Sequence, residues 1–329
     1  MGLLLSLFFG FASAFFFAWI IYWMDRYEKE PKVLLGAVFL WGAIVAAGLA
    51  FVVNTSLAIG VYLFTNSEAA TNLTTGTLIA PVVEELLKGL AVLAVFLVAR
   101  HEFDSILDGI VYAGIVALGF AATENTLYIY RDGYLENGYA GLFSLAFIRV
   151  VLVGWQHPFY TAFIGIGLAV TRLNRNPMTR LSALAAGLAL AIFLHSMHNT
   201  LASLVSGFGG FVMGTFIDWS GWIFMLLFVI WAIYREQQWI ARHLREEVSL
   251  GSLTPIQYRT ACSAWSQGIA RFGALFNGRF QATGRFYQLC AELAYKKEQL
   301  AAMGEEGGNS QRIEKLRGEL RRLSGRAVA

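Results

Sequence analysis

The sequence predicts an all-α polytopic membrane protein with about seven transmembrane helices and a C-terminal cytoplasmic helical tail. Of the 329 residues, 57% are hydrophobic and only 14% are charged, against about 25% charged in an ordinary soluble domain. Residues 1–234 hold 10 Lys and Arg and 13 Asp and Glu, whereas residues 235–329 hold 15 and 9. We therefore expect a transmembrane helical bundle over residues 1–234 and a basic cytoplasmic tail over residues 235–329.

Apolar runs of roughly 20 residues, bounded by charges or turn residues, define the expected spans. They lie near residues 2–24, 33–54, 78–99, 106–130, 141–171, 181–206 and 211–234. The fifth run is too long for one crossing and contains Arg149. We expect an interfacial stretch before this arginine and a span after it, with a guanidinium that can snorkel to the headgroups.

Positive charges in alternate loops predict the orientation, because cytoplasmic loops retain Lys and Arg. One set of loops contains only Arg131. The opposite set contains Arg26, Lys29, Lys32, Arg100, Arg172, Arg175, Arg180 and the basic tail. We therefore expect the N-terminus outside and the C-terminus in the cytoplasm.

The tail carries an amphipathic pattern between residues 257 and 303, typical of a docking or packing element whose partner the sequence does not identify. A stripe of Phe and Arg could instead lie on an anionic membrane surface. The apolar positions are Trp265, Ile269, Phe272, Leu275, Phe276 and Phe280. Cys262 and Cys290 are too few for a disulfide framework, and no nucleic-acid motif is present, so we expect no nucleic-acid partner.

Ionisable residues interrupt several apolar runs, where each costs at least about 2.5 kcal/mol by insertion scales. The third run contains Glu84, Glu85 and Lys88. Glu84 and Lys88 are four residues apart and share a helix face, so Lys88 can neutralise one carboxylate and leave the other free.

The next three runs add further polar groups. Glu124 lies near the outer end of the fourth run, His157 lies in the fifth, and His195 and Asn199 lie one helical turn apart in the sixth. A rise of 1.5 Å per residue puts Glu85 and these acids and imidazoles roughly 9–16 Å below the outer boundary. We expect them to meet in one layer of the outer half of the bilayer.

Carboxylates with two histidines are typical of a divalent metal with an activated water, or of a general base that acts on water directly. Either chemistry leads to hydrolysis. A serine protease loop is not present, since Asp218-Trp219-Ser220-Gly221 lacks the first glycine of the required motif. We expect His198 to serve packing or to lie at the membrane interface, and Asp104 and Asp108 to stabilise a helix N-terminus.

At these residues the sequence resembles the PrsW family of intramembrane proteases, which is related to the CAAX prenyl endopeptidases. The resemblance covers Glu-Glu-x-x-Lys at 84–88, the run from Leu107 to Tyr128, His157 with Thr161, and His195-x-x-x-Asn199. It implies hydrolysis of a peptide bond in or near the membrane-spanning segment of a membrane-anchored protein, with anti-sigma factors as the substrate class. It also implies an integral protein of a bacterial inner membrane.

The resemblance further implies roles for six catalytic residues, namely Glu84, Glu85, Glu124, His157, His195 and Asn199. The two adjacent glutamates would polarise the attacking water. The histidines, with Glu124, would position that water or a zinc ion, and Asn199 would donate to the oxyanion.

A tentative metal site implied by the resemblance comprises Glu85, His157 and His195. The related prenyl endopeptidases place a histidine where this chain has Glu124. We therefore expect Zn²⁺ as the cofactor. A metal-free carboxylate mechanism remains open.

Two other function classes explain the same polar residues. A proton- or ion-coupled transporter also needs ionisable groups at mid-membrane and predicts an inverted repeat, but the Glu-Glu-x-x-Lys segment has no second copy. A catalytically silent membrane scaffold would use the polar residues only for helix packing.

Overall fold

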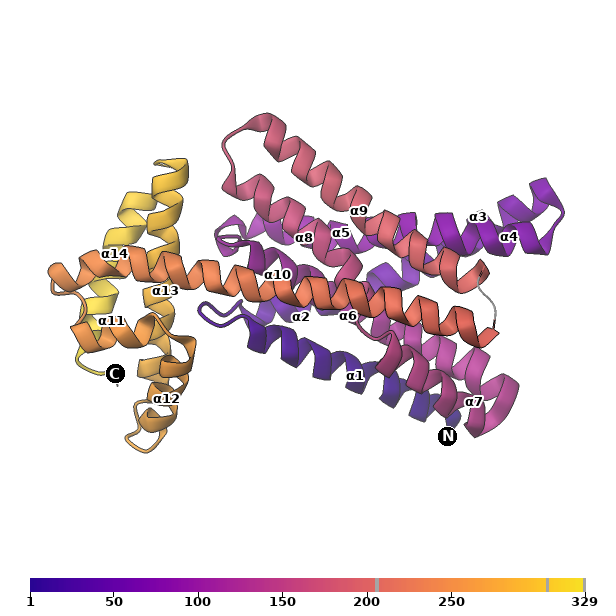
Figure 1. The fold of residues 1–329 in the computed structure, drawn as a ribbon, viewed down its shortest axis with the longest axis horizontal. Coiled ribbons are helices and arrows are strands. Elements are labelled where there is room, and N and C mark those ends of the chain that lie inside the picture. Colours follow the sequence, from indigo (N-terminus) through magenta and orange to yellow (C-terminus); the bar gives the residue numbers. More distant parts are fainter. Residues whose placement is uncertain (205–206, 306–307, 328–329) are drawn as a thin grey trace.

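The computed structural model describes residues 1–204, 207–305 and 308–327, and all regular secondary structure in these ranges is helical (Figure 1). The α-helices are α1 (Gly2–Met24), α2 (Lys32–Leu40), α3 (Ala47–Thr65), α4 (Glu68–Thr74), α5 (Ala80–Val98), α6 (Ile106–Tyr128), α7 (Glu136–Ala146), α8 (Gln156–Leu173), α9 (Pro177–Leu204), α10 (Gly207–Ser249), α11 (Pro255–Ala261), α12 (Ala264–Leu275), α13 (Phe280–Met303) and α14 (Asn309–Ser324). Shorter π-helical and 3₁₀ segments are η1 (Trp41–Ala46), η2 (Thr75–Ile79), η3 (Arg100–Glu102), η4 (Ile129–Leu135) and η5 (Phe147–Leu152).

Helices long and apolar enough to span a membrane support an integral membrane protein. Within the described residues they number five, and they are Gly2–Met24, Lys32–Thr65, Ile106–Leu173, Pro177–Leu204 and Val212–Ser249. The sequence predicts seven spans. Its fourth and fifth belong to the single helical path Ile106–Leu173, and its third corresponds to α5, where three charged side chains break the apolar run. The expected end of the sixth span, at residues 205–206, lies outside the described residues.

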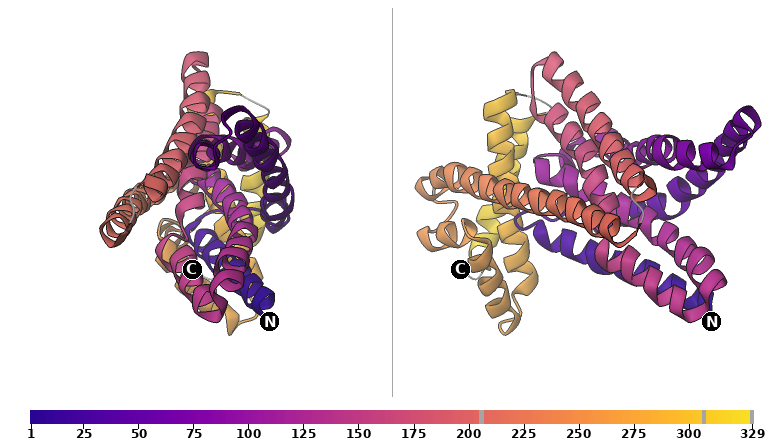
Figure 2. Two further views of the ribbon diagram at one scale, coloured as in Figure 1. Left: turned by 90° about the vertical axis from the view of Figure 1, so that its right-hand side faces the viewer. Right: turned by 45° about the vertical axis from the view of Figure 1, so that its right-hand side comes forward.

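Helix α6 forms the centre of the bundle, and every residue from Ile106 to Ala122 is buried. It packs against α1, α8 and η1, whereas α9 and α10 extend to one side (Figure 2). Glycines allow the closest approaches. A Cβ atom on Gly165 of α8 would lie 1.9 Å from the carbonyl oxygen of Gly109 on α6. Small residues at such crossings let membrane helices gain van der Waals contact.

Substituting Gly165→Ala is expected to lower the free energy of unfolding by about 1–3 kcal/mol, because the two helix backbones must separate to admit the methyl group. The measurement is thermal unfolding of the purified protein in micelles. Gly36→Ala is the matched control, since no atom lies within 4 Å of a Cβ at that position. Equal melting temperatures for the two variants would contradict the close crossing.

The π-helical segments expose backbone carbonyls that side chains of neighbouring helices use. Thr123 of α6 donates to the carbonyl of Ala43 in η1 at 2.7 Å, and Asn199 of α9 donates to the carbonyl of Gly76 in η2 at 2.8 Å. π-Helical turns are frequent at functional sites. Here η2 directly precedes α5, which carries Glu84 and Glu85.

The start of α6 is fixed by a capping box. The Ser105 side chain accepts from the backbone N–H of Asp108, and the Asp108 carboxylate accepts from the backbone N–H of Ser105 at 2.7 Å. The structure therefore confirms the expected structural role of Asp108. Asp104 instead forms a buried ion pair with Lys296 of α13, at 2.6 Å.

The C-terminal helices surround the end of α10, which continues without a break from the membrane helices (Figure 1). A second hydrophobic cluster joins Ile240 and Leu244 of α10 to Phe286 and Leu289 of α13, and it includes Tyr27 from the loop after α1. The helices α11 to α14 therefore contact the membrane helices at the end where α1 finishes and α6 begins.

Candidate active site

All the predicted catalytic side chains except Asn199 converge in the interior of the bundle. They come from α5 (Glu84, Glu85), α6 (Glu124), α8 (His157) and α9 (His195). The ring centroids of the two histidines lie 5.2 Å apart, and Tyr160 stacks on His195 at 5.1 Å. These helices thus supply carboxylates and imidazoles to one small volume.

Glu85 is fully buried, and both of its carboxylate oxygens have partners. One oxygen accepts from Lys88 Nζ at 2.5 Å and from Nδ1 of His195 at 3.0 Å, and the other accepts from Thr161 Oγ1 at 2.8 Å. The sequence suggested Glu84 as the partner of Lys88. The structure pairs Lys88 with Glu85 instead, because Thr161 of α8 and His195 of α9 lie on the side of α5 that Glu85 faces.

Glu84 is also buried, but its carboxylate is less satisfied. Oε1 accepts a long hydrogen bond of 3.4 Å from Asn54 Nδ2, whereas Oε2 has no hydrogen-bond partner. Oε2 lies 3.8 Å from Nε2 of His195. Two acceptors at this separation can be bridged by one water molecule that donates to both. Sequence analysis missed Asn54, which lies at the end of its predicted span.

The hydrogen-bond partners of the histidines assign their tautomers. Because a carboxylate only accepts, His195 donates from Nδ1 to Glu85, which leaves Nε2 directed toward Glu84. His157 accepts from Lys88 at Nδ1, at 3.2 Å, and donates from Nε2 to Glu124, at 2.9 Å. Both imidazoles are therefore held in fixed orientations by charged neighbours.

Arg149 contacts polar side chains of α6, and its expected snorkelling to the headgroups stays a prediction. Its guanidinium donates to Glu124 through Nη2 and to Asn125 through Nε, the latter at 2.7 Å. Arg149 lies in the π-helical segment η5. This cation stabilises the half-buried carboxylate of Glu124 next to His157.

Asn199 lies one turn beyond His195 on α9, where its amide donates to Gly76. This contact ties α9 to η2, just before the two glutamates. A carboxamide has a second N–H donor, so the predicted oxyanion role stays a prediction.

A second polar cluster, in which the sequence did not indicate the role of Asp218, joins α8, α9 and α10. Gln156 donates to Asp218 at 2.8 Å, and Nδ1 of His198 lies 3.1 Å from the same carboxylate. His198 therefore has polar partners and is not only a packing residue. The signal was present in the sequence as an aspartate within an apolar run. This cluster attaches α10 to the two helices that carry His157 and His195, the histidines predicted to be catalytic.

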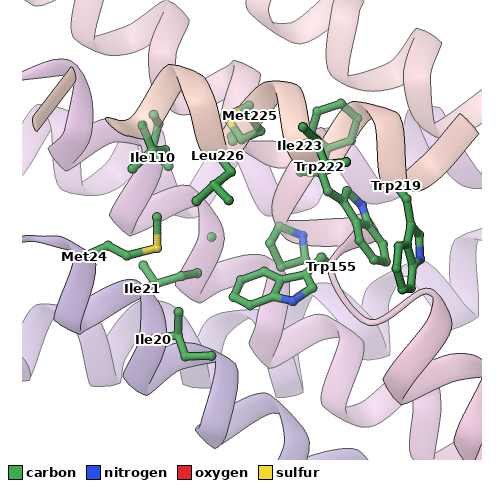
Figure 3. A pocket seen from close by; sticks show the side chains of 15 residues that line it. Ile20, Ile21, Met24, Ile110, Trp155, Trp219, Trp222, Ile223, Met225 and Leu226 are labelled. Carbon is green, nitrogen blue, oxygen red and sulfur yellow. The ribbon is translucent and has the colours of Figure 1, made fainter. Parts of the chain in front are cut away.

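An apolar cavity of about 320 Å³ lies between α10 and helices α1, α6 and α8 (Figure 3). On this side its wall is formed by Trp155, which precedes α8, and by Pro158, Phe159 and Ala162 of α8. At 100° per residue Phe159 and Ala162 lie about 160° and about 140° around the helix from His157, on its opposite face. The cavity is thus separated from the catalytic cluster by α8.

The cluster fits a divalent metal ion. Glu84, His157 and His195 each offer one ligand atom, and these atoms lie within 4.8 Å of one another. Two histidines and a carboxylate are a known donor set of catalytic zinc. A carboxylate on the far nitrogen of His195 is the usual second partner of a metal-binding imidazole. To bind the ion, His157 would give up one of its two hydrogen bonds, which join it to Lys88 and Glu124. The sequence assigned the carboxylate ligand to Glu85, but the structure favours Glu84, because both Glu85 oxygens are already bonded.

Carboxylates and imidazoles gathered among helices of membrane-spanning composition fit an intramembrane hydrolase. Comparison with known proteins identifies which one. Residues 30–233 match the PrsW family, described as intramembrane metalloproteases, and the chain belongs to this family. The resemblance found in the sequence is therefore confirmed, and the protein is an intramembrane protease.

Several curated relatives carry the name Protease PrsW. The chain is 30% identical to that of Geobacillus kaustophilus over 197 residues, which is 60% of this chain and 78% of the relative. It is 27% identical to Protease PrsW of Clostridioides difficile over 176 residues, which is 53% of this chain and 69% of the relative. It is 25% identical to Protease PrsW of Bacillus subtilis over 202 residues, which is 61% of this chain and 84% of the relative. No solved structure matches the chain. The family match ends at residue 233, where the basic C-terminal segment begins.

Proposed function

We propose that this protease hydrolyses a peptide bond in or near the membrane-spanning segment of a membrane-anchored protein, at the layer of Glu84, His157 and His195. The observation that supports it best is the unpartnered Oε2 of Glu84, which lies 3.8 Å from Nε2 of a histidine oriented by Glu85. A buried carboxylate oxygen without a partner is costly, and a bound water molecule would satisfy it.

In the metal-free alternative of the reaction, the water donates to Glu84 and to His195 and is thereby held next to the substrate. Glu84 takes a proton as the water oxygen bonds to the scissile carbonyl carbon. The C–N bond then breaks, and the leaving nitrogen receives that proton from Glu84. General acid–base catalysis of this kind contributes typically about 10²–10⁴-fold.

Other residues of the cluster position these groups. Lys88 neutralises the charge of Glu85, and Glu85 orients the imidazole of His195. Glu124 orients His157 and is itself neutralised by Arg149. Asn199 is retained as the proposed oxyanion donor. A substrate helix must unwind locally before its amide can react, because helical hydrogen bonds otherwise cover the scissile carbonyl.

A divalent metal ion, with Zn²⁺ as the proposed identity, would be held by Glu84, His157 and His195. It would supply Lewis acidity toward the water and the substrate carbonyl. The buried donor set described above supports this proposal, as does the family description.

We also propose seven crossings, with the N-terminus outside, residues 1–234 forming the bundle of a bacterial inner-membrane protein, and residues 235–329 forming a cytoplasmic tail. The order of the helices supports this proposal. Counted as alternating crossings, α1, α2 with α3, α5, α6, α8, α9 and α10 end with the tail on the side opposite to the N-terminus (Figure 1). The Lys- and Arg-rich loops lie on the side of the tail, as the positive-inside rule requires.

The test of the function is cleavage of a quenched single-span peptide by the full chain reconstituted in liposomes. We expect two fragments of defined mass from the wild type, and none above background from His195→Ala, which also serves as the control for contaminating proteases. Complete chelation should abolish cleavage and Zn²⁺ should restore it. Unchanged turnover after metal removal would refute the metal proposal and leave direct carboxylate catalysis. Proton or solute flux without peptide products would refute the proteolytic site.

A further inference from the structure

A polar pocket of about 290 Å³ lies where the C-terminal helices meet the end of α1. Tyr22 and Arg26 line it from the α1 side, and Arg271 of α12 and Arg285 of α13 line it from the other side. Because α1 is a candidate membrane span that ends at Met24, the pocket lies at the level of a membrane surface.

The charge of this pocket is strongly positive. Its lining includes Arg26, Lys29, Arg271 and Arg285, and contains no Asp or Glu among the described residues. Arg285 is partly neutralised by Glu292, at 2.6 Å. Within the part of the chain that the structure describes, Arg26 and Arg271 have no hydrogen-bonded carboxylate. Their guanidinium groups lie only over the rings of Trp23 and Phe280.

These cations are close enough to affect one another. Burial lowers the pKa of Lys29 to about 8. The charges of Arg26 and Arg271 act in the same direction, whereas the charge of Asp25 opposes the shift. The ammonium of Lys29 donates to the backbone carbonyls of Tyr22 and Asp25, so it adds charge to the pocket wall at a fixed place. A bound anion would relieve this repulsion.

An exposed apolar stripe lies on α12, next to the pocket. Trp265, Ile269, Phe272 and Phe276 follow helical spacing on one face, and Trp265 and Phe276 are 79% and 78% exposed. Helix α12 lies beside the C-terminal end of α1 (Figure 1). Aromatic and aliphatic side chains next to arginines are typical of helices that lie in a membrane interface.

We propose that this pocket binds the phosphate of an anionic phospholipid in the adjacent leaflet, while the α12 stripe inserts among its acyl chains. Arginine matches phosphate by paired N–H···O contacts, and the pocket offers two guanidinium groups without carboxylate partners. The apolar stripe favours a lipid over free phosphate, because only a lipid brings an apolar surface to the same place. The C-terminal helices, which contact the loop between α5 and α6 through the Lys296–Asp104 pair, are thus anchored to the membrane surface.

The test uses the full chain in micelles of a neutral detergent, with thermal unfolding measured during titration with short-chain phosphatidylglycerol, short-chain phosphatidylcholine or inorganic phosphate. We expect a saturable rise in melting temperature with phosphatidylglycerol and a much smaller one with the other two. The double variant Arg26→Gln/Arg271→Gln should bind phosphatidylglycerol roughly 25-fold more weakly, at roughly fivefold for each cation removed.

Two further variants separate the sources of binding. Arg259→Gln/Arg322→Gln removes the same charge at exposed positions outside the pocket, and it should bind as the wild type does. Phe272→Ser/Phe276→Ser should weaken binding of phosphatidylglycerol but not of inorganic phosphate. Equal responses to all three ligands, full response to inorganic phosphate alone, or unchanged lipid binding by the pocket variant would each overturn the proposal.

Discussion

Substituting Glu84→Gln is expected to lower kcat/KM for peptide hydrolysis at least about 100-fold, while the free energy of unfolding changes by no more than about 1 kcal/mol. The carboxamide keeps the shape of the side chain but can neither take a proton nor bind a metal through a charged oxygen. Stability should be retained because Oε2 of Glu84 has no hydrogen-bond partner and Oε1 receives only the 3.4 Å contact from Asn54. The measurement pairs initial cleavage rates with thermal unfolding in the same micelles.

The matched control is Glu68→Gln, an exposed position at the start of α4, which should leave both quantities unchanged. If Glu84→Gln retained more than a fifth of the wild-type activity, Glu84 would be a structural residue and another group would activate the water. The comparison with Glu85→Gln is informative, because that change should reduce both activity and stability. The structure thus distinguishes two adjacent glutamates that the sequence treated alike.

The convergence of these acids and histidines could be predicted from the sequence because ionisable residues are rare in apolar helices. Glu85, Glu124, His157 and His195 each stood out against an apolar run, and the helical rise put them at similar depths. The structure brings them together from four helices. Helical spacing alone could not decide which glutamate pairs with Lys88, since positions three and four residues away both face it.

Features that depend on tertiary contacts escaped prediction. The π-helical turns give no local signal, and two of them contain Arg149, which donates to Glu124, and Gly76, which accepts from Asn199. In the sequence, Asp218 stands next to an incomplete serine-protease motif, which gives no indication of its role. Its actual partners, Gln156 and His198, lie on other helices. Pairings between helices follow from packing, which periodicity in one sequence does not specify.

The largest loss of stability is expected for Lys88→Met. Lys88 is fully buried, pairs with Glu85, donates to His157 and lies 4.6 Å from the ring centre of Phe120. Removing one partner of a buried ion pair leaves an uncompensated charge, which costs about 3–5 kcal/mol. Methionine preserves most of the volume, so the loss reports the charge and not a cavity. Activity should also disappear, because Glu85 would no longer hold His195 in place.

A double variant, Lys88→Met/Glu85→Gln, separates the pair from the rest of the site. Removing both charges eliminates the unpaired carboxylate, so the double variant should be about 1–3 kcal/mol more stable than the sum of the two single changes predicts. Thermal unfolding in micelles at neutral pH measures the cycle, with Lys315→Met at an exposed position of α14 as the control for removing a lysine. Strictly additive changes would show that Lys88 and Glu85 do not interact in the folded protein. Restored stability without restored cleavage is the expected outcome, since a neutral carboxamide in place of the Glu85 carboxylate accepts the His195 proton less strongly.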